Sequence, residues 1–532
     1  MKYNFLIFFC LIMNSLSAQE RTVGLFLNED ESYNGYTLFT NSRTTHLIDN
    51  CGFVVNEWES SLTPGLGVYL LPDGNLLRCG RVSGAFNGGG VGGQFELFSW
   101  SGNSLWSYRF ADETRHSHHD IEPMPNGNFL AMAWTLMTAE EALAAGREFD
   151  NDVWIEKIYE IKIIGSGDIE IVWEWSMADH LVQDVFPDKP NYGVVAENPG
   201  KMNFNFIPEE EGVESDWAHF NAIAYNEALD QIAVSSRDFS EIWILDHSTT
   251  TAEAATSSGG KSGKGGDILY RYGNPQVYDR GTAEDQVFFF QHNIEWINDT
   301  YPNGGSLSVF NNRWQSERSR VERWTPPMDG DRYVLDGDEA YGPAEPDWTY
   351  DEEGFYATRI SGVQFLENGN AFVCSGVRGT FFEVTEEGRI VWEYINPMRS
   401  TLGPTTQGEP PFQNSVFRAL RYSPDYAAFD GRDLSPGEPI ELDPLPSDCI
   451  ITHVEEMDSA VETGISIRHN VVHQNAEIFS RENTEIRILS LDGHQVAKID
   501  LLNGVNHIDM SGVPSGVYFL AGKTEVLKLI KM

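Results

Sequence analysis

A repeated pair of features most constrains how this 532-residue chain folds: a short strand with alternating aromatic residues, followed by a hairpin with a polar turn. Most of the turns contain Asn-Gly or Asp-Gly, which is a strong hairpin signal between alternating strands. The turns lie at residues 72–75, 125–128, 226–230, 302–305, 367–370 and, more weakly, 423–425. The aromatic strands lie at residues 54–58, 106–108, 173–175, 270–272, 348–350 and 392–394. Six such repeats predict an all-β fold, a six-bladed β-propeller over residues 19–435.

Helical periodicity is scarce in the sequence, and residues 139–145 are one of few helical candidates. An α/β barrel needs a helix after every strand, so that fold is not expected. The uneven spacing of the six repeats is explained by insertions between them.

The chain carries a formal net charge of −44, from 80 acidic and 36 basic side chains. Such a charge repels nucleic acid and anionic membrane surfaces, so neither is expected as a partner. An anionic substrate gains nothing from this overall field, and any anion site must be built from local donors. The five cysteines are too few for a disulfide scaffold and lack zinc-site spacing, and neither a metal nor another cofactor is expected.

The two ends of the chain differ in composition from the repeats. Residues 1–18 have a basic start, an apolar core and a small-residue end, which predicts a signal peptide. No later run of about 20 apolar residues is present, so no membrane span is expected. Residues 436–455 are predicted to be a linker. Residues 456–532 are predicted to form a small, β-sandwich-like unit with strands near 485–489, 496–501 and 516–520.

The segment from Asp216 to Arg237 predicts a hairpin that carries polar side chains at one end. If its turn is centred near Ala228, His219 and Arg237 lie directly opposite each other on neighbouring strands. Asn221 follows His219 by two residues, so it is expected on the same face. Imidazole, guanidinium and amide donors at one place suit a tetrahedral oxyanion such as sulfate or phosphate.

Histidines recur at equivalent places in three successive repeats. In a propeller the first strand of each hairpin lines the central channel, and His118 and His119, His219, and His292 all fall on or beside such strands. Only 13 histidines occur in the whole chain, so this clustering favours a site over chance. The sequence does not decide which of His118 and His119 faces the channel.

Several motifs together resemble the bacterial aryl-sulfate sulfotransferases, over roughly residues 20–430. The resemblance implies a six-bladed propeller that moves a sulfuryl group from an aryl sulfate ester to a phenol, independently of the nucleotide sulfate donor. The motifs that carry it are Ser-His-His-Asp at 117–120, Trp-Ala-His-Phe-Asn at 217–221, Ser-Ser-Arg at 235–237, Gly-Asp-Ile-Leu-Tyr-Arg-Tyr-Gly-Asn-Pro at 266–275 and Gln-His at 291–292.

The resemblance also assigns roles to residues of this chain. It places the transiently sulfated histidine at His292. His219 and Arg237 are then catalytic, and the groups that hold the substrate sulfate are a histidine of the His118–His119 pair, Asn221 and, more weakly, Thr358.

The last segment resembles the C-terminal sorting domain of type IX secretion substrates. The residues that carry this resemblance are Asp492-Gly493, residues 486–488, 508–511 and 516–519, and the basic end of the chain. The resemblance implies export across the outer membrane by the type IX machinery, followed by release or surface attachment. The protein is therefore expected to be secreted or at the cell surface.

The residues alone leave other functions open. A non-catalytic propeller that binds a ligand or a surface glycan fits the aromatic repeats equally well, although the convergence of histidine and arginine favours an enzyme. A quinone-dependent dehydrogenase fits less well, because six repeats rather than eight are present. A metal hydrolase built on His116, His118 and Asp120 is a further alternative.

Overall fold

The computed structural model describes residues 20–208, 212–447 and 449, together with residues 465–467, 471–472, 475–480, 483–490, 494–521 and 526–531. The predicted signal peptide, residues 1–18, lies outside the described residues. The chain divides into two compact units, Met1–Ile451 and Thr452–Met532. None of the helices in the described part of the chain has the length and apolar character that a bilayer crossing requires.

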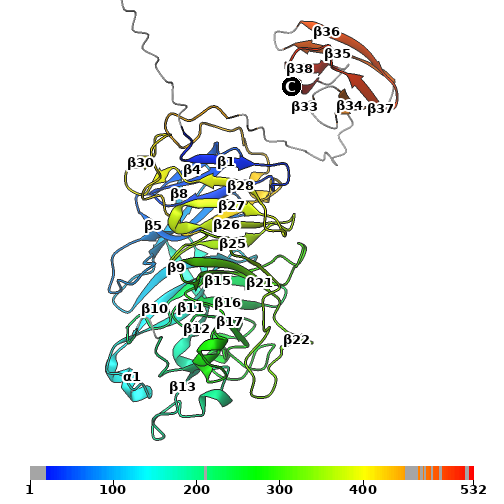
Figure 1. Ribbon diagram of the computed structural model, residues 1–532. Helices are drawn as coiled ribbons and strands as arrows, with labels where there is room; N and C mark the ends of the chain where they lie inside the picture. Colours follow the sequence, from blue (N-terminus) through cyan, green and yellow to red (C-terminus); the bar gives the residue numbers. More distant parts are fainter. Residues whose placement is uncertain are drawn as a thin grey trace, which may run out of the picture. The chain divides into compact units, whose positions relative to one another are not determined.

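The described part of the first unit contains six antiparallel sheets of four or five strands, and four of these use strands consecutive in sequence apart from short inserted ones (Figure 1). The first blade contains β5 (Pro64–Leu70), β6 (Leu76–Arg81), β7 (Gly93–Phe98) and β8 (Ser104–Arg109), and the second contains β9 (Arg115–Pro123), β10 (Phe129–Met137), β11 (Val153–Ile164) and β12 (Asp168–Ser176). The third contains β15 (Phe220–Asn226), β16 (Gln231–Ser236), β17 (Glu241–Asp246) and β18 (Tyr270–Tyr272). The fourth contains β19 (His292–Trp296), β20 (Leu307–Gln315), β21 (Arg318–Trp324) and β24 (Trp348–Tyr350).

The remaining two sheets of the first unit take strands from both ends of the chain. The fifth sheet contains β25 (Gly362–Phe365), β26 (Ala371–Ser375), β27 (Thr380–Val384), β28 (Ile390–Ile395) and, added at its edge, β1 (Gly24–Asn28). The sixth contains β31 (Ala419–Tyr422), β2 (Tyr36–Thr40), β3 (Thr44–Ile48) and β4 (Val54–Glu59). Strand β31 pairs with β2, so the C-terminal strand closes the ring against N-terminal strands.

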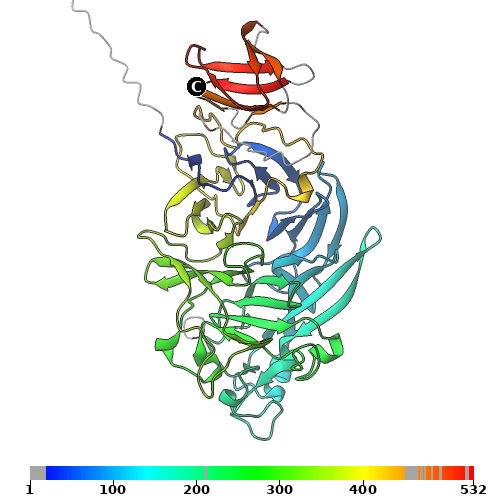
Figure 2. The same ribbon diagram turned by 90° about the vertical axis from the view of Figure 1, so that its right-hand side faces the viewer.

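The first strands of the sheets form the inner wall of a ring. Strand β5 contacts β9, β9 contacts β15, β15 contacts β19, β19 contacts β25, β25 contacts β31, and β2 contacts β5. Figure 2 shows the sheets following one another around this ring in sequence order. A cavity of about 190 Å³ on the axis is lined by residues of all six inner strands. The prediction of a six-bladed propeller is therefore confirmed.

One predicted turn is wrong. Residues 423–425 do not join a hairpin, because β31 ends at Tyr422 and its sheet neighbour β2 comes from the other end of the chain. A turn signal is local, whereas the pairing of β31 is set by closure of the ring. The helical candidate at residues 139–145 is confirmed as α1 (Ala139–Ala145), which begins with a capping box between Thr138 and Glu141.

Shorter elements lie in the connections. The second helix is α2 (Thr251–Ala254). Two-residue strands pair as β13 (Leu181–Val182) with β14 (Met202–Asn203), β22 (Met328–Asp329) with β23 (Arg332–Tyr333), and β29 (Met398–Arg399) with β30 (Gly403–Pro404). Single 3-10 turns are η1 (Met177–His180), η2 (Val195–Glu197), η3 (Pro275–Tyr278), η4 (Ala283–Asp285), η5 (Gly376–Arg378) and η6 (Ala427–Phe429).

The repeated aromatic strands are the last strands of the blades: β4, β8, β12, β18, β24 and β28. Most of their aromatic side chains are buried, and pairs such as Trp392 and Tyr394 stack with ring centres 5.9 Å apart. Burying a large ring removes extensive apolar area from water. These residues therefore pack blade against blade and do not line the channel.

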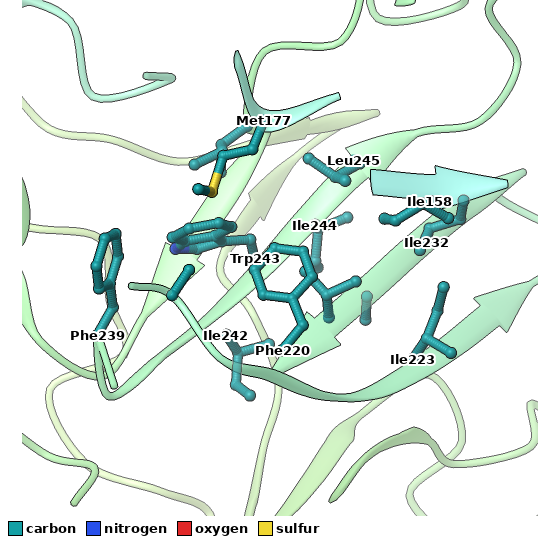
Figure 3. Close-up of a cluster of buried hydrophobic side chains, with 14 of the residues drawn as sticks. Ile158, Met177, Phe220, Ile223, Ile232, Phe239, Ile242, Trp243, Ile244 and Leu245 are labelled. Atoms are coloured by element: carbon teal, nitrogen blue, oxygen red, sulfur yellow. The ribbon is translucent and has the colours of Figure 1, made fainter. Parts of the chain in front are cut away.

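The packing beside the second and third blades fixes the start of β15. Trp243 of β17 lies among Met177, Phe220 and Phe239, all fully buried (Figure 3). The ring centres of Phe220 and Trp243 are 5.3 Å apart, edge to face. Because Phe220 directly follows His219, this core holds the backbone from which the His219 side chain extends.

The first part of the predicted linker is bonded to the propeller. Pro439 bridges to Phe53, and Leu442 bridges to Thr406. A disulfide joins Cys51 to Cys449, and the remaining described cysteines, Cys79 and Cys374, are buried and reduced.

The second unit is all-β in its described part. One sheet contains β32 (Ile465–Ile467), β34 (Asn475–Ser480) and β37 (Gly504–Asp509). The other contains β33 (Val471–Val472), β39 (Val526–Lys531), β38 (Gly516–Ala521), β35 (Thr484–Ser490) and β36 (Gln495–Leu501). Ile478, Ile486 and Leu520 belong to one buried cluster that draws on both sheets.

Candidate active site

Four of the predicted residues lie close together: His119, His219, Arg237 and His292. They lie where the inner strands of the second, third and fourth blades begin or bend. The ring centres of His119 and His219 are 4.8 Å apart. The backbone N–H of Arg237 donates to the carbonyl of His219 at 3.1 Å, which confirms that these two residues oppose each other. His292 and Arg237 are both near enough to His119 to act on it electrostatically.

The backbone at this place departs from regular β-structure in each blade. His119, His219 and Asn293 have φ values of 52°, 49° and 61°, in the left-handed region that residues other than glycine rarely adopt. The strand registers shift at the same places, in β9, β15 and β19. Bulges of this kind redirect a side chain, and strained backbone is concentrated at functional sites.

His219 is held as a cation by Asp216. Its Nδ1 lies 2.8 Å from Oδ2 of Asp216, three residues earlier in the chain. Burial disfavours the charged imidazole, but the Asp216 carboxylate outweighs it, and together they raise the pKa of His219 to about 9. At neutral pH His219 is therefore protonated and donates from Nε2.

His292 has the opposite character. Its Nδ1 lies 2.8 Å from Oδ1 of Asn312 and 3.1 Å from the carbonyl of Phe290. Both partners are acceptors, because the Asn312 amide nitrogen donates to the carbonyls of Ala357 and Ile360. Nδ1 therefore carries the proton, and Nε2 carries a lone pair. Burial, followed by the charge of Arg237, lowers the pKa of His292 to about 3.

Two guanidinium groups stack on one aromatic ring beside the histidines. The guanidinium carbons of Arg237 and Arg313 lie 4.6 Å and 4.3 Å from the centre of the Phe290 ring. Arg237 also pairs with Asp238. Stacking on a ring face restrains the orientation of a guanidinium. Arg313 was not identified from the sequence, because β20 carries no local signal that sets it apart.

His118 lies behind His119. Its Nδ1 is 3.0 Å from Nδ1 of His119, and its Nε2 is 2.9 Å from Oε2 of Glu156. The His118 ring stacks on Trp134 with centres 4.0 Å apart. His119 is thus the member of the pair that lies against His219. Burial, with the charge of His219 next, lowers the pKa of His119 well below its ordinary value.

A loop of three glycines covers these groups. A Cβ on Gly88 would lie 2.8 Å from Oδ2 of Asp216, and one on Gly89 would lie 3.3 Å from Cε1 of His219. A Cβ on Gly90 would lie 2.2 Å from Nε2 of His119, and φ of Gly90 is 76°. The run Gly88–Gly90 is visible in the sequence and marks a close approach of backbone to the site.

Asn221 and Thr358 both contact segments that carry other residues of the site. Asn221 occupies the bulge in β15, which interrupts the alternation with His219, and its amide donates to the carbonyl of Gln291 at 2.7 Å. Thr358 presents its carbonyl to Nε of Arg313 at 3.4 Å. Both contacts fix segments next to His292 and Arg313.

The metal-hydrolase alternative has no support in the geometry. Asp120 forms a double ion pair with Arg418, and His118 is bonded to Glu156. Within the described residues, no three His, Cys, Asp or Glu side chains lie close enough together to hold a metal ion.

The assembled groups match a substrate with a charged tetrahedral group. His219 and Arg237 supply positive donors that suit its anionic oxygens. His292 supplies an unprotonated nitrogen, which is a nucleophile. Two histidines whose surroundings push their pKa values apart are the usual mark of divided roles in one reaction.

The family model described as Arylsulfotransferase (ASST) matches residues 40–407, which span the propeller from β2 to the end of the fifth blade and beyond. A curated relative, "Arylsulfate sulfotransferase AssT" of Lelliottia amnigena, is 29% identical over 170 residues. That match covers 30% of this chain and 27% of the relative.

Solved structures with a similar arrangement are more distant. A protein of unknown function from Bacteroides caccae has 11% identity and a TM-score of 0.40, covering 73% of this chain and 99% of its own. The periplasmic gluconolactonase PpgL of Pseudomonas aeruginosa has 10% identity and a TM-score of 0.38, covering 68% and 96%. These likenesses bear on neither the reaction nor the substrate.

Proposed function

Because this chain belongs to the arylsulfotransferase family, we propose that it moves a sulfuryl group from an aryl sulfate ester to a phenolic acceptor through a sulfated histidine. The observation that carries the proposal is that two histidines of one site have partners of opposite kind. Nδ1 of His292 donates to Oδ1 of Asn312, which leaves a lone pair on Nε2, whereas the Asp216 carboxylate holds Nδ1 of His219 and raises its pKa to about 9.

The donor half-reaction begins with attack of Nε2 of His292 on sulfur. The N–S bond forms as the S–O bond to the aryl oxygen breaks, and the phenolate leaves with the electron pair. Asn312 keeps the proton on Nδ1 and orients the ring throughout. A covalent intermediate divides one difficult displacement into two easier ones.

Charge on the sulfuryl oxygens is the main obstacle to this attack, because they repel a nucleophile. His219 and Arg237 offset that charge with donors that are already oriented in the free protein. Preorganised donors of this kind usually contribute the largest part of catalysis. Phe290 lies two residues before His292, and its ring contacts both Arg237 and Arg313. The contact with the ring restrains the Arg237 guanidinium.

Transfer rather than hydrolysis is the first expected result. Adding a phenol to purified protein with a chromogenic aryl sulfate should raise donor turnover, and the sulfated phenol should accumulate. The reason is that a phenol fits the site better than water does and therefore reacts faster with the sulfuryl group on His292. Turnover that is equal with and without phenol, and that yields inorganic sulfate alone, would identify a sulfatase instead.

We further propose that the protein is exported, with residues 1–18 as signal peptide and the second unit as a sorting domain for type IX secretion. A disulfide between Cys51 and Cys449 supports passage through an oxidising compartment. The second unit has a buried cluster of its own, which supports a separable role.

Deletion of residues 456–532 should leave the purified protein folded and active but block its export in the native host. The cut retains Cys449, and with it the disulfide to Cys51. Circular dichroism, sulfate transfer and cell fractionation measure the three outcomes against the full chain. A truncated protein that loses its fold or its transfer activity in vitro would contradict a purely sorting role.

A further inference from the structure

Three buried side chains form a hydrogen-bonded chain that ends at the site. Oε2 of Glu156 lies 2.9 Å from Nε2 of His118, and Nδ1 of His118 lies 3.0 Å from Nδ1 of His119. The side chains of Glu156 and His118 are fully buried. The other Glu156 oxygen accepts the backbone N–H of Phe220 at 2.8 Å, which fixes the carboxylate in place.

The order of donors and acceptors along this chain follows from the chemistry of its ends. A carboxylate only accepts, so Nε2 of His118 carries a hydrogen. We take His118 to carry this hydrogen alone, so that its Nδ1 presents a lone pair to which Nδ1 of His119 donates. The remaining nitrogen of His119, Nε2, is left with a lone pair. Among the residues that the structure describes, none is bonded to it.

The neighbours of His119 keep it neutral. The groups that face it are His118 from its own strand, His219 and Arg237 from the third blade, and His292 from the fourth. Burial is the largest influence, and these positive or potentially positive groups add to it, so that the pKa of His119 is well below its ordinary value. A neutral, buried imidazole with an unprotonated nitrogen is a base and not an anion donor.

We infer that Glu156, His118 and His119 form a proton relay that deprotonates the phenolic acceptor in the second half-reaction. This inference rests on the proposed function, because it needs a sulfated enzyme and a phenol. It assigns His119 as the general base, with His118 and Glu156 as positioning residues behind it.

The step balances in atoms and charge. The phenol O–H bond breaks as an N–H bond forms at Nε2 of His119, and the phenolate oxygen attacks sulfur while the S–N bond to His292 breaks. The N–H bond at Nδ1 of His119 breaks as one forms at Nδ1 of His118. The positive charge then rests on His118 beside the Glu156 carboxylate.

The relay avoids electrostatic repulsion between positive charges in this site. His219 and Arg237 are already positive, so a cation on His119 would be repelled by both. Moving the charge one residue back, next to a buried carboxylate, relieves that repulsion. The relay therefore suits phenols that are not ionised at the working pH, since those need a base.

The test is Glu156→Gln, assayed with two acceptors. The Gln amide donates to His118, which reverses the order of donors and leaves a hydrogen on Nε2 of His119. Transfer to a phenol that is un-ionised at the assay pH should fall by about 100-fold. Transfer to an acidic nitrophenol, already ionised, should fall by less than about threefold. The single-turnover release of phenolate from a chromogenic donor without acceptor should be unchanged.

Glu160→Gln is the matched control. Glu160 lies on the same strand, β11, and its Oε2 also contacts a histidine, His247, at 3.2 Å, but outside the site. In this variant the rates of transfer to both acceptors should be unchanged. If Glu156→Gln does not fold, His118→Phe serves instead, because Phe keeps the stacking on Trp134 and removes both nitrogens. It should show the same selective loss.

Two results separate the failure of the relay from the failure of the proposed function. Equal losses toward both acceptors, with normal phenolate release, would overturn the relay alone. Absence of phenolate release from the unaltered protein would overturn the proposed function, and the relay with it.

Discussion

His292→Asn is expected to abolish sulfate transfer, with a loss of more than about 10³-fold. Asn places an N–H near the position of Nδ1, so the hydrogen bond to Asn312 is kept while the nucleophilic Nε2 is removed. The fold should therefore survive. Steady-state turnover of a chromogenic aryl sulfate, alongside circular dichroism, measures both outcomes.

The same prediction has a direct chemical readout. The unaltered protein, quenched with donor alone, should gain the mass of one SO₃ group on the peptide that contains His292, and the variant should gain none. His247→Asn is the matched control, because His247 is bonded to Asp230, in the turn between β15 and β16, and to Glu160 of the second blade. An adduct on the peptide that contains His119 or His219 would assign the nucleophile to that histidine instead. Release of phenolate without any adduct would contradict the two-step mechanism.

Asp216→Asn is expected to shift the pH dependence of turnover by more than two units. In the unaltered protein His219 stays protonated up to its pKa of about 9, so turnover should decline only above that pH. Asn keeps an acceptor for Nδ1 but removes the charge. Burial, the largest influence, then outweighs the smaller effect of the Asp238 charge, so we expect the pKa of His219 to fall below its ordinary value of 6.5. At pH 7.5 turnover should fall about tenfold or more.

The sign of this shift is what makes the experiment informative. Turnover of Asp216→Asn should recover as the pH falls below about 6, because His219 regains its proton there. Asp230→Asn breaks a comparable pair, in which Nδ1 of His247 lies 2.8 Å from Asp230, and should leave the profile unchanged. A loss in Asp216→Asn that is the same at every pH would mean that Asp216 only supports the fold.

Much of the site was predictable because its members lie near one another in sequence or at equivalent repeat positions. The opposition of His219 and Arg237 followed from a hairpin with a readable turn, and it is confirmed by their backbone hydrogen bond. Asp216 lies three residues before His219, and the sequence held that signal too. Asn312 and Glu156 are buried on β20 and β11, where no local pattern marks them.

The sequence by itself determined the blade count, the inner strands and the set of histidines, because hairpin turns, aromatic alternation and repeat spacing are local properties. Only the tertiary structure decided which ring nitrogens of His119 and His292 face hydrogen-bond partners and which do not. That depends on Asn312 and Glu156, which reach their histidine partners from other strands. It also decided how the ring closes, since β31 pairs with β2 from the opposite end of the chain. Contacts between residues far apart in the sequence are set by closure of the whole fold, and a local sequence pattern does not predict them.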